Sequence, residues 1–108
     1  MSQTTYRPRV IDAILRDALE ASGAVWLQGP KWCGKTWTAR QVAQSVLMMQ
    51  DPDESANYIQ QAMVKPSLLL DGAIPRLIDD WQVAPMLWDA IRFAVDQRGE
   101  MGQFILTG

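Results

Sequence analysis

Apolar and polar residues follow each other along this chain in two different patterns. Over residues 10–21, apolar side chains return every three or four positions and charged side chains occupy the other face, which predicts an amphipathic helix. The same helical spacing recurs in residues 35–44, in 54–64, with Asp53 as the expected cap, and in 85–97. A proline at the start of the last segment and a glycine after it fit the beginning and the end of a helix.

Short apolar runs lie between these helical segments. The runs at residues 24–28, 45–50 and 103–108 have the length and content of buried strands. Two further runs, at 67–71 and 74–80, each end on aspartate and are also strand candidates. Because strands alternate with helices, we expect an α/β fold around a parallel sheet.

Composition and charge exclude several classes of function. Hydrophobic residues make up 48% of the 108 residues, which is enough for a packed core, and the net charge of −2 argues against a strongly basic nucleic-acid surface. The chain has no histidine, so metal sites and general bases built on histidine are excluded. Cys33 is the single cysteine, which rules out an internal disulfide and fits a reducing compartment.

The sequence shows no sign of a membrane segment. Its first residues lack the apolar core of a signal peptide, and no apolar run approaches the length that crosses a bilayer. We therefore expect a soluble, cytoplasmic protein without a membrane partner.

The motif that points most clearly to a binding site directly follows the first predicted strand. Residues 29–36 match G-x-x-x-x-G-K-[ST] without a mismatch and read Gly29-Pro30-Lys31-Trp32-Cys33-Gly34-Lys35-Thr36. In such a loop the glycines let the backbone approach a ligand, and successive N–H groups bind anionic oxygens. The lysine brings a charge to the β- and γ-phosphates, and the threonine hydroxyl is a ligand for Mg²⁺. A strand before the motif and a helix after it supply the required context, so we expect ATP and Mg²⁺ as ligands.

A phosphate loop of this kind needs an acidic partner at the end of a neighbouring strand. Asp71 is one candidate, and the pair Asp79-Asp80 is the other. The pair is favoured because hydrolysis needs one carboxylate for the metal shell and an adjacent one for the attacking water. We expect Asp79 to complete the Mg²⁺ shell with Thr36, and Asp80 to act on the water.

Several segments together resemble the AAA-type P-loop ATPases of bacteria and archaea, in particular the group whose nucleotide domain precedes a C-terminal domain of unknown function. The segments are "YRPRVID", "LQGPKWCGKTWTA", "MQDPD", "PRLIDDWQ", "LWDAIRFAVDQRG" and "GQFILTG". The resemblance implies a three-layer P-loop NTPase sandwich with a mostly parallel sheet. It also implies that residues 29–36 are the Walker A loop, that Asp79 is the Walker B aspartate, and that Thr107 is the sensor-1 residue.

The chain departs from the family pattern in two ways. Asp80 stands where the family usually has glutamate, and the chain stops at Gly108, before a further strand, a helical lid and the C-terminal domain. We therefore expect residues 1–108 to be the N-terminal part of an AAA-type ATP-binding domain whose sheet is incomplete at the C-terminus. No arginine finger can be assigned, so turnover by this chain alone should be very slow or absent.

The resemblance also implies a strand order. The strand at 24–28 should lie beside the strand at 103–107 and form an edge of the sheet, which predicts self-association along that edge. Possible partners are therefore ATP and a second copy or another ATPase subunit.

Two other functions stay open. A small P-loop kinase would need an arginine-rich lid, but Arg76, Arg92 and Arg98 are scattered along the sequence. A nucleotide-gated interaction module without hydrolysis would fit Asp80 in place of glutamate. Most of the five tryptophans are expected to pack in the core or at an interface rather than to stack on bases.

Overall fold

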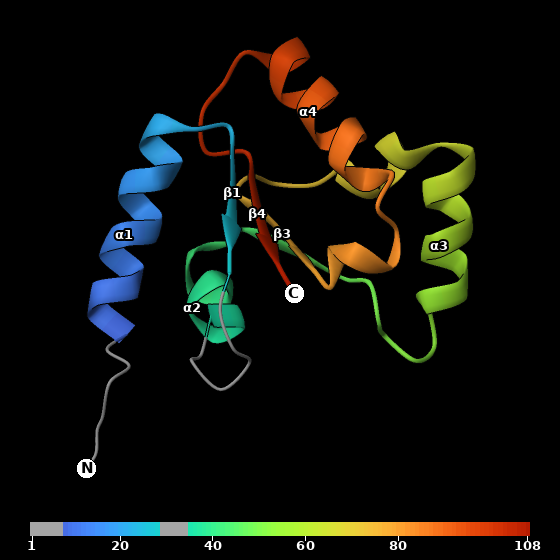
Figure 1. Ribbon diagram of the computed structural model, residues 1–108, viewed down its shortest axis with the longest axis horizontal. Coiled ribbons are helices and arrows are strands. Elements are labelled where there is room, and N and C mark those ends of the chain that lie inside the picture. The colour runs from blue at the N-terminus through green and yellow to red at the C-terminus, as the bar shows by residue number, and fades with distance from the viewer. Residues whose placement is uncertain (1–7, 29–34) are drawn as a thin grey trace.

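One parallel sheet organises the chain. The computed structural model describes residues 8–28 and 35–108, with side chains from residue 12 to 28 and from residue 37 onward. The described residues contain four strands, all parallel, in the order β1-β4-β3-β2 (Figure 1). In that order the strands are β1 (Ala24–Leu27), β4 (Phe104–Thr107), β3 (Arg76–Asp79) and β2 (Ser45–Met48).

Helices connect the strands, as parallel neighbours require. The described α-helices are α1 (Pro8–Ala21), α2 (Lys35–Val42), α3 (Ser55–Val64) and α4 (Leu87–Arg98). Two short 3₁₀ helices, η2 (Pro66–Leu70) and η3 (Trp81–Val83), flank β3 along the chain. None of the helices in the described part of the chain is long and apolar enough to span a bilayer.

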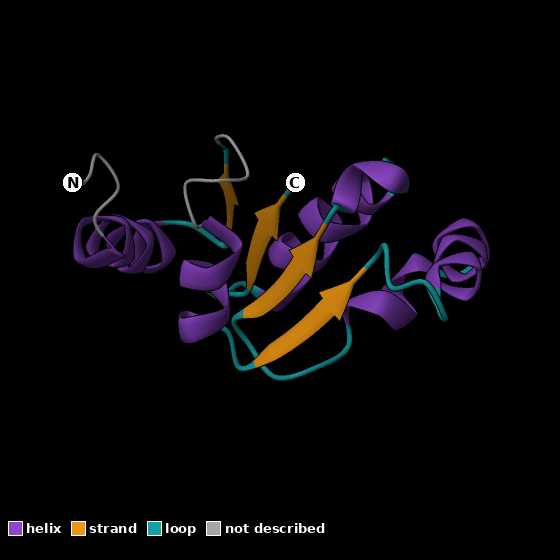
Figure 2. Cartoon of the chain, turned by 90° about the horizontal axis from the view of Figure 1, so that it is seen from below, coloured by secondary structure: helices purple, strands orange, loops and turns teal. Residues whose placement is uncertain are grey.

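The helices cover both faces of the sheet, which makes three layers (Figure 2). On one face, α1 and α2 pack on alternate strand residues in a cluster of Leu15, Leu19, Ala39, Val42, Leu77 and Ile105. On the other face, α3, α4, η2 and η3 pack on the intervening strand residues, including Leu47, Ile78, Phe104 and Leu106. Successive strand residues point to opposite faces, so each strand contributes to both clusters.

The expected α/β fold with a parallel sheet is confirmed, and the predicted helices are present with ends that differ by one or a few residues. The implied strand order is also confirmed: β1 pairs with β4, and in the described residues no strand pairs with its other side.

Two local predictions are wrong. The apolar run at residues 67–71 is not a strand; most of it lies in η2, where the neighbouring side chains of Leu69 and Leu70 are both buried. Alternating strand side chains would place these two residues on opposite faces, whereas a tight turn packs both into the cluster beneath α4. Asp53 does not cap α3: Glu54 occupies the cap position, and the backbone N–H of Asp53 donates to Asp51 Oδ1 at 2.9 Å.

Candidate functional site

Two predicted site residues meet at the carboxyl edge of the sheet. Asp79 is the last residue of β3 and Thr107 is the last residue of β4, and the two are register partners. Leu27, the last residue of β1, is the register partner of Thr107 on the other side. Since parallel strands end at the same edge, the end of β1 and the two polar residues form one row. Ligands of open α/β sheets bind outside this edge.

The Asp79–Thr107 contact is buried and short. Thr107 Oγ1 donates a hydrogen bond to Asp79 Oδ1 at 2.5 Å, and the residues are 8% (Asp79) and 0% (Thr107) exposed. A hydroxyl bond of this length to a carboxylate is of the strong, charge-assisted kind. Thr107 therefore fixes the direction in which the Asp79 carboxylate points.

Asp80 turns the chain out of β3. Its backbone is left-handed, with φ 57° and ψ 41°, a conformation that aspartate tolerates better than most residues. The Asp80 N–H donates to the Thr107 carbonyl at 2.7 Å, so β3 remains tied to β4 beyond its last residue. Asp80 also borders an open depression of about 430 Å³, whose other lining residues are Met48, Gln50, Asp51 and Pro52.

Asp71, the other acidic candidate, lies elsewhere. It follows η2 and precedes β3, so it belongs to the amino edge of the sheet, and it acts electrostatically on Arg76, the first residue of β3. Burial lowers the pKa of Arg76 and the Asp71 charge opposes that shift. Arg76 also donates to the Leu69 carbonyl at 2.8 Å and to Ser45 Oγ at 3.1 Å. Asp71 and Arg76 therefore interact with residues at the amino edge of the sheet, away from Asp79 and Thr107.

The Walker A match lies largely outside the described residues. Gly29, Pro30, Lys31, Trp32, Cys33 and Gly34 are not described, and neither are the side chains of Lys35 and Thr36. The elements on either side of the match are described: β1 ends at Leu27 and α2 begins at Lys35. They are the strand and the helix that this motif requires.

The donor set at the carboxyl edge suits Mg²⁺. No group of three or more acidic, Cys or His residues in the described segments could hold a metal ion unaided. Mg²⁺ usually keeps several waters and is bound by one or two carboxylates together with substrate phosphates. The buried carboxylate of Asp79, held by Thr107 at the carboxyl edge of the sheet, fits that type of binding.

Gln82 also lies at this edge of the sheet. A Cβ atom added to Gly108 would collide with Gln82 Oε1 and would lie 3.1 Å from the Asp80 Cα. The side-chain amide of Gln82 is therefore packed over the residue that follows β4. No sequence pattern points to this contact, because it depends on how η3 folds back after Asp80.

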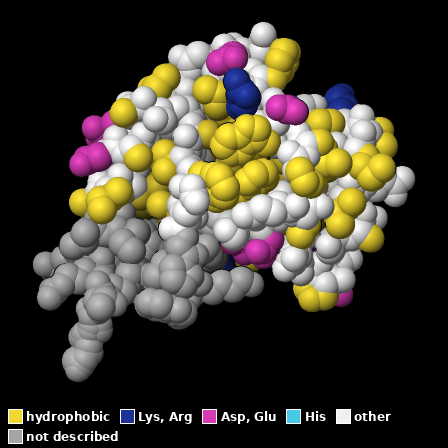
Figure 3. All heavy atoms as spheres, viewed as in Figure 1, with side chains coloured by type: hydrophobic (Ala, Val, Ile, Leu, Met, Phe, Trp, Pro, Cys, Tyr) yellow, Lys and Arg dark blue, Asp and Glu magenta, His cyan; other side chains and the backbone are white. Residues whose placement is uncertain are grey.

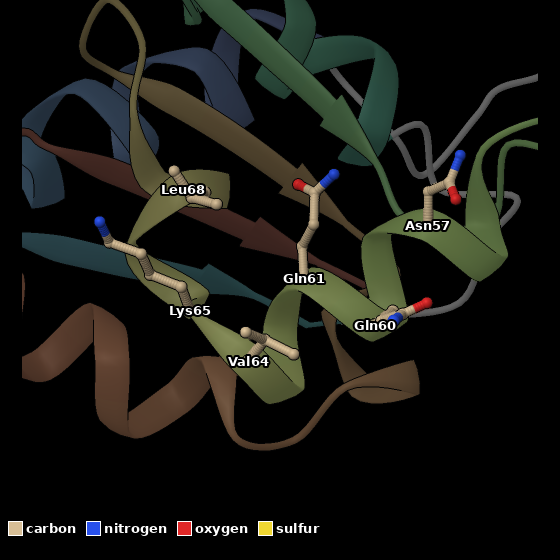
Figure 4. Close-up of a pocket in the computed structure, with 6 residues that line it drawn as sticks. All are labelled: Asn57, Gln60, Gln61, Val64, Lys65 and Leu68. Atoms are coloured by element: carbon tan, nitrogen blue, oxygen red, sulfur yellow. The ribbon is translucent and has the colours of Figure 1, made fainter.

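A second hollow lies away from this edge. It has a volume of about 310 Å³ and is formed by α3 and the turn into η2, with the lining residues Asn57, Gln60, Gln61, Val64, Lys65 and Leu68 (Figure 4). It contains no carboxylate, so it offers no ligand of the kind that Mg²⁺ prefers.

Three of the five tryptophans contact one another, and of these Trp81 is buried while Trp26 and Trp88 are partly exposed. Trp26 of β1, Trp81 of η3 and Trp88 of α4 have ring centroids 5.3 to 5.9 Å apart. Hydrophobic side chains also gather in the middle of the face shown in Figure 3.

The three-layer arrangement, with a parallel sheet in which β3, the neighbour of β4, ends in a buried carboxylate, is that of a P-loop NTPase. A model of the AAA domain family matches residues 21–108, and the chain belongs to this family. Membership indicates a nucleotide-binding function of the AAA type. No curated protein and no solved structure matches the chain.

Proposed function

We propose that the chain binds ATP with Mg²⁺ through residues 29–36 as part of an AAA-type ATPase. The observation that carries the proposal is the buried Asp79–Thr107 pair, which ends β4, the neighbour of β1, and β3, the strand beyond β4. The phosphate-loop motif follows β1 directly in the sequence. The pair and the motif therefore belong to the same edge of the sheet, which is where such folds bind ligands.

Each residue has a chemical task in this proposal. Backbone N–H groups of the loop and the N-terminal end of α2 bind phosphate oxygens, and Lys35 adds a full positive charge. Bound Mg²⁺ would neutralise part of the charge on the phosphates. Thr36 would ligate it directly and Asp79 mainly through water, while the Thr107 hydroxyl holds the Asp79 carboxylate in place.

Hydrolysis by this chain alone should be very slow or absent. In this proposal Asp80 would orient an attacking water, but its side chain is one methylene shorter than that of glutamate. Arginine fingers contribute roughly 10³–10⁵ to the rate of related reactions, and none can be assigned in this sequence. The short side chain of Asp80 also favours a second candidate function, a nucleotide-gated interaction module without hydrolysis. Either function suits the cytoplasm, where Cys33 stays reduced.

Titration calorimetry with ATP and Mg²⁺ tests the proposal. The chain should bind ATP, and Lys35→Ala should weaken binding because it removes the phosphate-binding charge. Asp79→Asn should reduce the dependence of ATP binding on Mg²⁺, whereas Asp71→Asn, the matched control at the amino edge, should not. A folded sample that does not bind ATP would refute the proposal. An effect of Asp71→Asn in place of Asp79→Asn would refute the assignment of the metal-shell aspartate.

A further inference from the structure

Strand β1 forms one edge of the sheet, and its outer side pairs with no strand in the described part of the chain (Figure 2). The Gly23 carbonyl accepts a hydrogen bond from the Phe104 N–H at 3.1 Å, and Phe104 is the register partner of Ala24. Because backbone groups alternate in direction along a strand, the N–H and C=O of Val25 face β4, whereas those of Ala24 and Trp26 face outward. These outward groups can pair with another strand.

A groove lies beside this edge, between the sheet and α4. It has a volume of about 270 Å³, and its apolar lining residues are Ala24, Leu106, Trp88, Ile91 and Val95. Helix α4 lies close to the start of β1, because a Cβ atom added to Gly23 would collide with the Val95 side chain. A strand that pairs with the outer side of β1 would therefore bring its side chains to this groove.

The side chains of β1 itself complement the groove. Trp26 lies on the same face of β1 as Ala24, two residues further along, and it is 39% exposed although its ring contacts Trp81 and Trp88. When two copies of β1 pair antiparallel about a two-fold axis at Val25, Ala24 of one copy lies opposite Trp26 of the other. In this register the outward groups of these two residues exchange both backbone hydrogen bonds. The large indole ring then meets the small alanine at the groove.

The charged residues of the groove are also complementary to a second copy. Arg92 and Asp96 lie one turn apart on α4, and neither forms an ion pair or a hydrogen bond with another described residue. A two-fold axis perpendicular to the sheet keeps both copies of α4 on the same face and makes them antiparallel. In such a symmetric interface each contact occurs twice, so Arg92 of each copy can meet Asp96 of the other.

We infer that two copies of the chain associate through β1 and α4 into one continuous sheet, with Trp26 of each copy lying at the groove of the other. The β1 strands pair antiparallel about Val25, and ion pairs between Arg92 and Asp96 join the two α4 helices. The inference goes beyond nucleotide binding and does not depend on it.

Charge reversals on α4, followed by sedimentation velocity, test the two-fold arrangement. Arg92→Glu alone brings like charges together at both symmetric contacts and should raise the Kd of self-association roughly tenfold or more, as should Asp96→Lys alone. An equal mixture of these two variants should associate as well as the unmodified chain, because every contact between them again joins opposite charges. Lys65→Glu, at the exposed end of α3, changes the net charge as Arg92→Glu does and should leave association unchanged.

A disulfide across the two-fold axis tests the register independently. Facing residues of a non-hydrogen-bonded antiparallel pair have Cα atoms about 4.5 Å apart, which is within the range of a disulfide. In a Cys33→Ser background, Val25→Cys should therefore give a cross-linked dimer under mild oxidation. Val46→Cys in the same background is the matched control, because Val46 is an exposed residue of β2 at the opposite edge of the sheet, and it should not cross-link.

Three results would overturn the inference. The first is an unmodified chain that stays monomeric at all concentrations. The second is a mixture of Arg92→Glu and Asp96→Lys that associates no better than either variant alone, or a loss of association in Lys65→Glu equal to that in Arg92→Glu. The third is a Val25→Cys variant that cross-links no more than Val46→Cys.

Discussion

Strands β1 and β4 are neighbours with the same length and similar composition, yet their environments differ. All four residues of β4 are buried, whereas Ala24, Val25 and Leu27 of β1 are half-buried and Trp26 is 39% exposed. The difference comes from position: β4 lies between β1 and β3, while β1 has a described neighbour only in β4. The central strand therefore stabilises the sheet and carries Thr107, and the outer strand carries the loop sequence.

The two strands also differ in how their backbones are paired. Gly23, just before β1, accepts hydrogen bonds through its carbonyl from the N–H groups of Gln103 and Phe104, at 2.9 and 3.1 Å. In a trans peptide the next N–H points the opposite way, so the Ala24 N–H faces away from β4. β4 has a strand on each side, and the outer row of β1 has none among the described residues.

The largest expected effect is a core truncation in β4. Leu106→Ala removes a side chain that is 1% exposed and should lower the free energy of unfolding by about 2–5 kcal/mol. Leu27→Ala is the matched change in β1, and since Leu27 is only half-buried it should cost about half as much or less. Urea denaturation of both variants measures the difference. Equal costs would mean that β1 is buried as deeply as β4 in solution.

This contrast marks how far the sequence predicts the fold. The runs that became β1 and β4 are both short and apolar, so their pattern identifies strands but not which strand is central. The run at residues 67–71 is equally apolar and forms a 3₁₀ helix instead, because Leu69 and Leu70 find one common cluster beside α4. Burial of this kind depends on tertiary neighbours, which a local pattern does not contain.

The candidate site also has one part that the sequence predicts and one part that it does not. The sequence predicts that Asp79 ends a strand, because it follows an apolar run. The structure places it beside Thr107, as the implied strand order requires. The contact between Gln82 and Gly108 joins two residues far apart in the sequence through the left-handed turn at Asp80. Neither the turn nor the contact has a signature in the sequence, so only the folded chain reveals them.

The next largest effect concerns the buried pair at the end of β4. Thr107→Val keeps the shape of the side chain and removes the donor to Asp79, which leaves a buried carboxylate oxygen without that bond. We expect a loss of about 1–3 kcal/mol in the free energy of unfolding. Thr107→Ser retains the hydroxyl and should recover most of it. A valine variant as stable as the original would show that the hydrogen bond contributes little.

A smaller effect is expected for the aromatic contacts that attach β1 to the rest of the molecule. Trp26 meets Trp81 edge to face, with centroids 5.3 Å apart and an interplanar angle of 89°. Such pairs contribute about 0.5–1.5 kcal/mol beyond area burial. In a double-mutant cycle with Trp26→Leu and Trp81→Leu, the coupling energy should fall in that range. A coupling near zero would indicate that the Trp26–Trp81 contact does not help to attach β1.

The smallest effect on stability, and the sharpest test of the outer edge, comes from Ala24→Pro. Proline is tolerated at the first residue of a strand, and here it removes an N–H that points away from β4, so folding should be nearly unaffected. An apolar edge strand without charges is a template for pairing with another chain, and we expect the unmodified protein to self-associate along β1. Sedimentation velocity over a range of concentrations should show this association and its reduction in Ala24→Pro. A monomer at all concentrations would mean that the outer backbone groups of β1 are already protected. Association that the proline does not reduce would place the contact on another surface, such as the exposed apolar side chains of Met63, Val64 and Leu68.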